Sequence, residues 1–160
     1  MKVSPLLWIA LPVSCVDEVI QLQTQSISPI PAVNPCLLGI TNQRGKMLWV
    51  LHLEKFLGIK PVPLSKQIST IAIRAQIPNG GICRLACVVM SLEEIITLDS
   101  EKFFPVPDKL PLRVRTLLSG LVNIDKKTYG ILNMNAVFRL LNPEMGSNQE
   151  TTGEVVRQGA

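Results

Sequence analysis

Hydrophobic and polar residues alternate most clearly in residues 68–77, where Ile71, Ile73, Ala75 and Ile77 occupy every second position. This period of two predicts a β-strand with one buried face. A Pro-Asn-Gly-Gly turn follows at positions 78–81, and the next nine residues are almost wholly apolar. The pattern predicts a β-hairpin whose returning strand is covered on both faces.

A second hairpin is predicted in residues 39–58. Its first strand ends at Asn42, the chain turns through Arg44 and Gly45, and an apolar strand returns over residues 47–53. Asn and Gly readily adopt the positive φ angles that such a turn requires. One helical turn over residues 54–57 follows. We therefore expect Arg44 to lie at the tip of a rigid hairpin.

Most of the remaining chain is predicted to be extended. Five further segments have the composition and spacing of strands: residues 6–11, 13–22, 95–98, 113–124 and 129–134. Residues 13–22 mix strand and helix spacing, which is typical of a strand with a bulge, and Gly120 marks a kink or bulge in a later strand.

Asparagine residues mark two predicted helical segments. Asn34 precedes a proline and predicts one turn of helix through Leu38, and Asn135 is expected to cap a helix over residues 136–141. Residues from 144 onward are polar and poor in apolar side chains, which predicts a disordered tail.

One pattern occurs twice. The segment Leu38-Gly39-Ile40-Thr41-Asn42, a turn, an apolar strand and the pair Leu53 and Phe56 recur as Ser119-Gly120-Leu121-Val122-Asn123, a turn, an apolar strand and the pair Met134 and Phe138. This imperfect repeat predicts two similar sheet units that pack together.

Composition narrows the choice of function. The chain has 160 residues, enough for one domain or two small subdomains, with 47% hydrophobic but only 4% aromatic residues. Such a chain needs an aliphatic core, and its mean hydropathy of +0.31 predicts apolar surface that is available to partner proteins. The net charge is +4, but the basic residues are scattered and do not alternate with aromatic residues. Nucleic-acid binding is therefore not predicted.

Catalytic and metal-binding patterns are also missing from the sequence. The four cysteines show no Cys-x-x-Cys spacing and are expected to be free thiols in a reducing cytoplasm. His52 lies in an apolar strand without a partner motif, which favours a structural role over catalysis. Asp17-Glu18 and Glu93-Glu94 are adjacent pairs, and adjacent side chains in a strand point to opposite faces. No enzyme, cofactor, metal site or membrane-spanning segment is predicted.

Arg44 allows two interpretations at this point. It is either a solvated arginine at a hairpin tip, or an arginine displayed to pair with an acidic residue such as Glu18 near a partner surface.

Residues 38–45, followed by Leu48-Trp49-Val50-Leu51-His52-Leu53, resemble the Gly-x-x-Asn-x-Arg-Gly hairpin and following strand of the CheW family of chemotaxis coupling proteins. The segment Val16-Asp17-Glu18-Val19-Ile20 is similar to that family's Val-x-Glu-Ile/Val segment, and the later hairpins and closing helix also match. The resemblance covers roughly residues 8–142.

The resemblance implies an all-β fold of two small five-stranded SH3-like barrels that share a hydrophobic core, with short helical turns. The domain would span residues 1–142, with its N-terminal strand reduced, and residues 143–160 would form the tail. The implied function is a non-enzymatic adaptor that couples the cytoplasmic tips of methyl-accepting chemoreceptors to a CheA-type histidine kinase. The pathway would be chemotaxis, phototaxis or pilus-dependent motility. The alternative is a protein-interaction module of the same fold with a role outside taxis.

By the same resemblance, partner binding is expected to involve Val16, Glu18, Asn42, Arg44 and Gly45, with Glu18 as the ion-pair partner of Arg44. The sequence also departs from the family pattern. His52 and Met90 replace acidic residues, Ala86 replaces glycine, and the strand before Trp8 is reduced to residues 1–7. These changes leave open whether the partners are those of a standard coupling protein.

Overall fold

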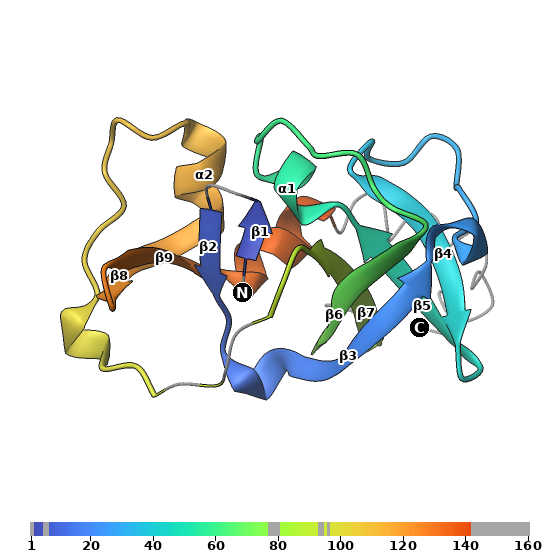
Figure 1. Cartoon of the computed structure of the whole chain (residues 1–160), viewed down its shortest axis with the longest axis horizontal. Coiled ribbons are helices and arrows are strands. Elements are labelled where there is room, and N and C mark those ends of the chain that lie inside the picture. Colours follow the sequence, from blue (N-terminus) through green and yellow to red (C-terminus); the bar gives the residue numbers. More distant parts are fainter. Residues whose placement is uncertain (1, 5–6, 77–80, 93–94, 96, 142–160) are drawn as a thin grey trace.

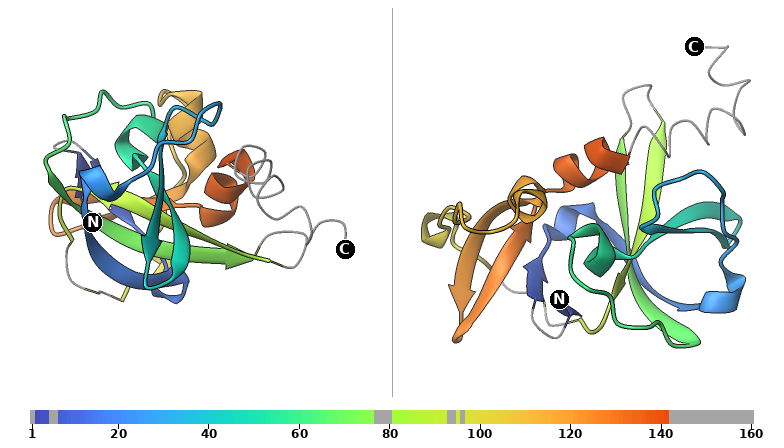
Figure 2. Two further views of the ribbon diagram at one scale, coloured as in Figure 1. Left: turned by 90° about the vertical axis from the view of Figure 1, so that its right-hand side faces the viewer. Right: turned by 90° about the horizontal axis from the view of Figure 1, so that it is seen from above.

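Two small β-barrels lie side by side in the computed structural model, which describes residues 2–4, 7–76, 81–92, 95 and 97–141 (Figure 1). The strands belong to two sheets, one of five strands and one of four. The right-hand view of Figure 2 shows the same two lobes from above. The predicted all-β architecture of two SH3-like barrels is confirmed.

The first barrel contains the five-stranded sheet. Its order is β3 (Val16–Gln23), β6 (Gln67–Gln76), β7 (Ile82–Val89), β5 (Lys46–Leu51) and β4 (Leu37–Gln43). All neighbours are antiparallel except β5 and β7, which are parallel. Its interior is filled by small and aliphatic side chains: Ile20, Leu22, Leu48, Val50, Ile68, Ala72, Ala86 and Val88.

The second barrel combines the two ends of the described chain. Its sheet has the order β1 (Lys2–Ser4), β2 (Leu7–Ala10), β9 (Lys127–Leu132) and β8 (Leu118–Ile124). Strand β2 pairs with β9 in parallel, and β8 and β9 form an antiparallel hairpin. The strand that precedes Trp8 is only three residues long.

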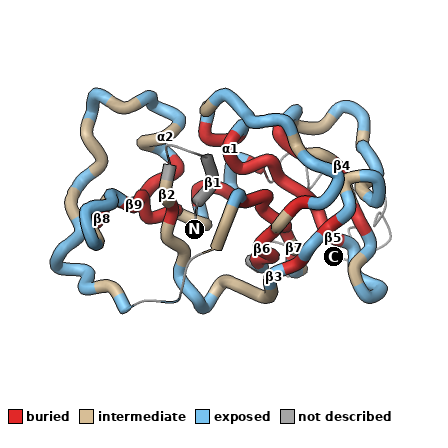
Figure 3. The backbone as a smooth tube through the Cα atoms, viewed as in Figure 1, coloured by how far each residue is buried: buried red, intermediate tan, exposed pale blue. Residues whose placement is uncertain are grey.

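A shared core joins the two barrels. It contains Ile9 of β2, Trp49 and Leu51 of β5, and Val137 and Phe138 of a helix over residues 134–141. The buried part of the backbone accordingly runs through the middle of the molecule, along β5, β7 and β9 (Figure 3). Arg113 adds a polar contact between the barrels, because its Nε donates to the Phe56 carbonyl and its guanidinium lies 4.8 Å from the centroid of the Phe56 ring.

The predicted internal repeat is present in three dimensions. The hairpin β4–β5 with helix α1 (Leu53–Phe56) corresponds to the hairpin β8–β9 with helix 134–141. The first strand of each hairpin has an irregular register next to its glycine, Gly39 or Gly120. Each of these strands also forms a bridge to a preceding loop, through Ile40 to Ser28 and through Leu121 to Phe104.

Backbone geometry extends this correspondence to the turns and helix starts. Arg44 and Gly45 have φ angles of 54° and 79°, and Asp125 and Lys126 have φ angles of 47° and 69°. One residue, His52 or Asn133, lies between each hairpin and the helix that follows it. Its backbone N–H donates a hydrogen bond of 2.8 Å to a backbone carbonyl that precedes the hairpin. Because each turn has two successive positive φ angles, both turns have the twisted geometry that suits a tight hairpin.

The strand predicted over residues 113–124 is only partly correct. Its first part is not a strand but helix α2 (Leu112–Leu117), and β8 begins only at Leu118. The alternation of Leu112, Val114 and Thr116 resembles a strand, but the Arg113 and Arg115 side chains bond to the carbonyls of Phe56 and Leu110. The contact between Arg113 and Phe56 is tertiary, and tertiary contacts of this kind can override a local β preference.

Three smaller predictions also differ from the structure. Residues 34–36 form a turn rather than a helix, because the Asn34 side chain accepts from the Cys36 N–H and β4 starts immediately afterwards. The final helix is capped by Asn133, whose Oδ1 accepts from the Ala136 N–H at 3.1 Å, and not by Asn135. Residues 95, 97 and 98 are not in a strand. The hairpin turn at 77–80, the Glu93-Glu94 pair and the tail from residue 142 lie outside the described residues.

Candidate functional site

The tip of the β4–β5 hairpin displays Arg44. The Asn42 side chain accepts a hydrogen bond from the Gly45 N–H at 2.9 Å, which holds the turn in place. The side chain of Arg44 is 77% exposed, and its Nη1 lies 3.3 Å from Oε2 of Glu18 on β3. The ion pair expected between these two residues is therefore present, and Asn42 and Gly45 support the turn that presents it.

A β-bulge at the start of β3 changes the expected arrangement of the acidic pair. Val16 lies opposite Ile73 and Glu18 lies opposite Ala72, so Asp17 is an extra residue in the register. The expectation that Asp17 and Glu18 point to opposite faces is wrong, because a bulge interrupts the alternation of side chains. Both carboxylates contact the same guanidinium group, that of Arg84 on β7.

Five side chains form what we call the charged network: Arg74, Asp17, Arg84, Glu18 and Arg44. Arg84 Nη2 lies 2.6 Å from Asp17 Oδ2 and 3.6 Å from Glu18 Oε1. At one end Arg74 Nη1 lies 3.6 Å from Asp17 Oδ1, and at the other end Arg44 contacts Glu18. Positive and negative groups therefore alternate along the network.

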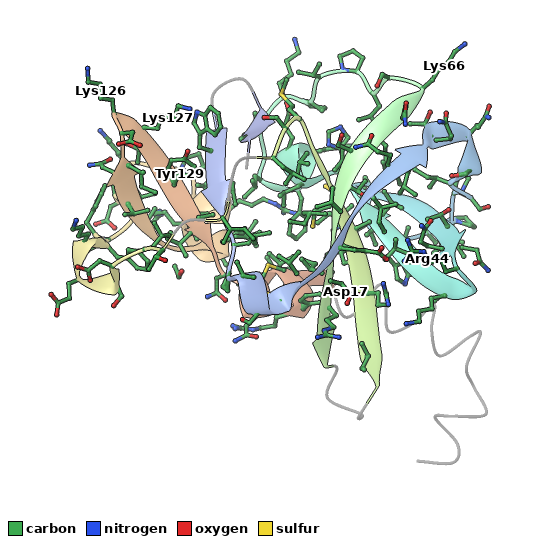
Figure 4. All side chains as sticks on the ribbon, turned by 60° about the horizontal axis from the view of Figure 1, so that its bottom comes forward. Asp17, Arg44, Lys66, Lys126, Lys127 and Tyr129 are labelled. Atoms are coloured by element: carbon green, nitrogen blue, oxygen red, sulfur yellow. The ribbon has the colours of Figure 1, made fainter. Side chains whose placement is uncertain are left out.

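The network covers one end of the first barrel. Arg74 and Arg84 are directly opposite one another on β6 and β7, two positions beyond the buried pair Ala72 and Ala86. Because side chains two apart share a face, the arginines continue the row of residues that fills the barrel interior. In Figure 4, Asp17 and Arg44 lie at the same end of this barrel.

An apolar groove borders the face of β3 opposite to the charged network. Its volume is about 460 Å³, and most of its lining is aliphatic: Ile9, Ala10, Leu11, Val13, Val16, Val19, Ile71, Leu92, Ile95, Leu98 and Ile124. The lining comes from both barrels, and Val13, Val19 and Ile95 are each more than half exposed. The polar part of the lining, Asp125, Lys127 and Tyr129, lies on the β8–β9 hairpin.

The residues predicted from the sequence fall into two groups, one in the groove and one in the charged network. Val16 lines the groove, whereas Glu18 and Arg44 belong to the network. Sequence reasoning missed Arg74 and Arg84, which only the observed register of β6 and β7 places opposite one another. It also missed the groove residues of the second barrel, which only the tertiary fold brings next to Val16.

The cysteines and His52 have no arrangement that suggests catalysis or metal binding. None of the four cysteines forms a disulfide bond, and burial raises the pKa of the Cys87 thiol to about 12. His52 is buried, and desolvation lowers its pKa below the usual value. Within the described residues, no three His, Cys, Asp or Glu side chains cluster around a possible metal position. In the same part of the chain, no helix is long and apolar enough to cross a bilayer.

Comparison with known proteins identifies a family whose sequences match this chain. Residues 6–142 match the sequence family described as "CheW: CheW-like domain". A curated relative from Rhizobium etli, named "Probable chemotaxis protein CheW", is 26% identical over 104 residues, which are 64% of this chain and 63% of that protein. The chain thus matches less than two thirds of the length of this relative.

A solved structure is also similar. The crystal structure of the scaffolding protein TtCheW from Thermoanaerobacter tengcongensis superposes with a TM-score of 0.64 at 26% sequence identity, covering 78% of this chain and 80% of that one. The resemblance found in the Asn-x-Arg-Gly hairpin thus agrees with comparisons of sequence and of structure.

Proposed function

The chain belongs to the CheW-like domain family, and from that premise we propose that it is a non-enzymatic adaptor in the cytoplasm. It couples the cytoplasmic tip of a chemoreceptor to a CheA-type histidine kinase and holds the two in a fixed relative orientation. A shift of the receptor then changes the activity of the kinase. The pathway is chemotaxis, phototaxis or pilus-dependent motility.

The observation that carries this proposal is the ion pair between Arg44, at a rigid hairpin tip, and Glu18 on strand β3. The same strand also lines the apolar groove. A groove of about 460 Å³ with an aliphatic lining suits the apolar stripe of an amphipathic helix, as in other helix-in-groove complexes. Arg44 supplies a charged group that can pair with an acidic residue of a partner. Apolar and charged contacts together provide affinity and orientation.

The proposal assigns the groove around Val16 to apolar contact with a partner. Val19 is 52% exposed and lines the same groove, whereas Val16 is half-buried, so Val19 offers the larger surface to an incoming helix. Asn42 and Gly45 act indirectly, because they fix the turn that carries Arg44. No residue is assigned a catalytic role.

A binding measurement with purified components tests this function. The regulatory domain of a CheA-type kinase and a receptor cytoplasmic fragment, both from the source organism, are titrated with the wild type and with Arg44→Ala. We expect the substitution to weaken binding of at least one partner about tenfold, a loss of about 1.4 kcal/mol. Thermal unfolding should be nearly unchanged, because exposed ion pairs contribute about 0–1 kcal/mol to stability.

Lys66→Ala is the matched control, since Lys66 is exposed and lies at a different end of the first barrel (Figure 4). It should bind like the wild type. If the wild type binds neither partner, the adaptor function is wrong and the alternative, an interaction module with a role outside taxis, takes its place. If Arg44→Ala unfolds the protein, the role assigned to this residue is wrong.

A further inference from the structure

The charged network ends in two exposed guanidinium groups. The side chains of Arg44 and Arg74 are 77% and 58% exposed, whereas that of Arg84, between the two carboxylates, is 17% exposed. Three arginines face two carboxylates, so the network carries one net positive charge. Its excess positive charge is therefore displayed at its two ends, on the outside of the first barrel.

The contacts are tight in the middle of the network and looser at its ends. Arg84 lies 2.6 Å from Asp17, while Arg44 and Arg74 each contact one carboxylate of the network, at 3.3 Å and 3.6 Å. A guanidinium group has several N–H donors in a planar fork, so each outer arginine keeps donors for a further acceptor. Because exposed ion pairs are weak, an incoming carboxylate can share or replace these outer contacts at small cost.

We propose that Arg44 and Arg74 together form one binding site for an acidic surface of a partner protein, each pairing with a carboxylate of that partner. This inference rests on the proposed adaptor function and adds Arg74 as a second contact residue. It also makes Arg84 a positioning residue, which acts through Asp17 and Glu18 without touching the partner.

The role of Arg84 follows from the charges that it separates. Asp17 and Glu18 are adjacent in sequence and both approach its Nη2 atom. Without this guanidinium, two carboxylates would face each other at the end of an apolar barrel with only the outer arginines to neutralise them. Arg44 and Arg74 would then turn inward, and their donors would be less available to a partner.

Isothermal titration calorimetry with the two purified partners tests the site. The proteins are the wild type, Arg44→Gln, Arg74→Gln, the double variant and Lys66→Gln as the charge-matched control. We expect Arg74→Gln to weaken binding about tenfold for the same partner that is affected by Arg44→Gln. Lys66→Gln should bind like the wild type. The affinity of Arg74→Gln should also depend less steeply on salt between about 50 mM and about 300 mM, since one charged contact is lost.

Arg84 is tested by a second pair of variants. Arg84→Gln should weaken binding of the same partner, and adding Asp17→Asn should restore part of the affinity, because it removes the carboxylate that Arg84 had neutralised. If the role of Arg84 were merely structural, Arg84→Gln would lower the free energy of unfolding but would leave the affinity of the folded protein for the partner unchanged. Circular dichroism confirms that each variant is folded before its affinity is compared.

The outcomes separate this inference from the function on which it rests. If the wild type binds a partner but Arg74→Gln binds as tightly as Lys66→Gln, the paired-arginine site is wrong and the adaptor function stands. The same conclusion follows if Arg44→Gln and Arg74→Gln weaken different partners. If the wild type binds neither partner, the proposed function fails and the inference fails with it.

Discussion

Gly39 offers a sharp test of the packing around the first hairpin. Its φ angle is +140°, and a Cβ atom added there would lie 2.1 Å from the Ser28 carbonyl oxygen and 2.9 Å from the Cα of Pro29. Both obstacles are backbone atoms, so no side-chain rotation can relieve the clash. Gly39→Ala must therefore move the loop at Ser28 away from β4.

The cost has two parts. A non-glycine residue in a sparsely populated backbone region costs about 1–3 kcal/mol. Moving the loop also breaks the two hydrogen bonds between Ser28 and Ile40, of 2.8 Å and 2.9 Å, at about 0.5–1.5 kcal/mol each. Lower entropy of the unfolded chain offsets about 0.4–1 kcal/mol of this loss. We expect a net loss of about 2–5 kcal/mol in the free energy of unfolding.

The internal repeat supplies the control. Gly120 holds the equivalent position in β8, but its φ angle is not positive and an added Cβ would lie 3.2 Å from the Phe104 carbonyl oxygen. A shift of a few tenths of an ångström relieves this contact. Gly120→Ala should therefore change the free energy of unfolding by less than about 1 kcal/mol.

Urea unfolding monitored by circular dichroism and by the fluorescence of buried Trp49 measures both variants. For a chain of this size, the expected loss for Gly39→Ala corresponds to a decrease of roughly 4–20 °C in Tm. Equal stability of the two variants would refute the reasoning, because it would mean that neither the backbone angle nor the clash at Ser28 limits position 39.

Two further predictions concern buried titratable groups. The pKa of the Cys87 thiol is 9.0 in the unfolded chain, and burial raises it to about 12 in the folded one. Above pH 9 the unfolded state therefore releases a proton that the folded state keeps. The wild type should therefore lose about 1.4 kcal/mol more per pH unit than Cys87→Ala in this range, and parallel alkaline stability curves would contradict this assignment. Burial lowers the pKa of His52 below 6.5, so the unfolded state takes up a proton first and the free energy of unfolding falls as the pH drops below 6.5. His52→Asn, which copies the equivalent Asn133, should remain folded and lose less stability than the wild type between pH 7 and pH 5; an identical pH profile would exclude a contribution from His52.

The sequence was most informative where local chemistry determines the structure. The Arg44-Gly45 turn and the strands beside it were predicted correctly, because positive-φ residues and apolar runs act over a few positions. The internal repeat was found for the same reason. Helix α2 was missed because its Arg113 side chain contacts Phe56, which is distant in sequence, and such a contact leaves no mark in the local pattern.

The candidate site was predicted only in part, also for physical reasons. The Glu18–Arg44 pair was anticipated from the resemblance to the CheW family, whereas the residues alone left Arg44 either solvated or paired. The mixed spacing of residues 13–22 correctly predicted a bulge in this strand, but it did not show that Asp17 is the extra residue, and the place of Asp17 in the network depends on that position. The groove needs residues from both barrels, so only the packing of the two lobes reveals it.

The parallel pairing of β2 with β9 also sets the order in which this chain can fold during synthesis. Strand β2 ends at Ala10, whereas its partner strand begins at Lys127. At about 5–20 residues per second, a ribosome needs roughly 6–23 seconds to add the intervening chain. The five strands of the first barrel are contiguous, from Val16 to Val89, and can pair during that interval. The nascent chain therefore carries a nearly finished first barrel while β2 can pair only with the three-residue strand β1. The edge of β2 that later pairs with β9 stays open until synthesis of the domain is almost complete.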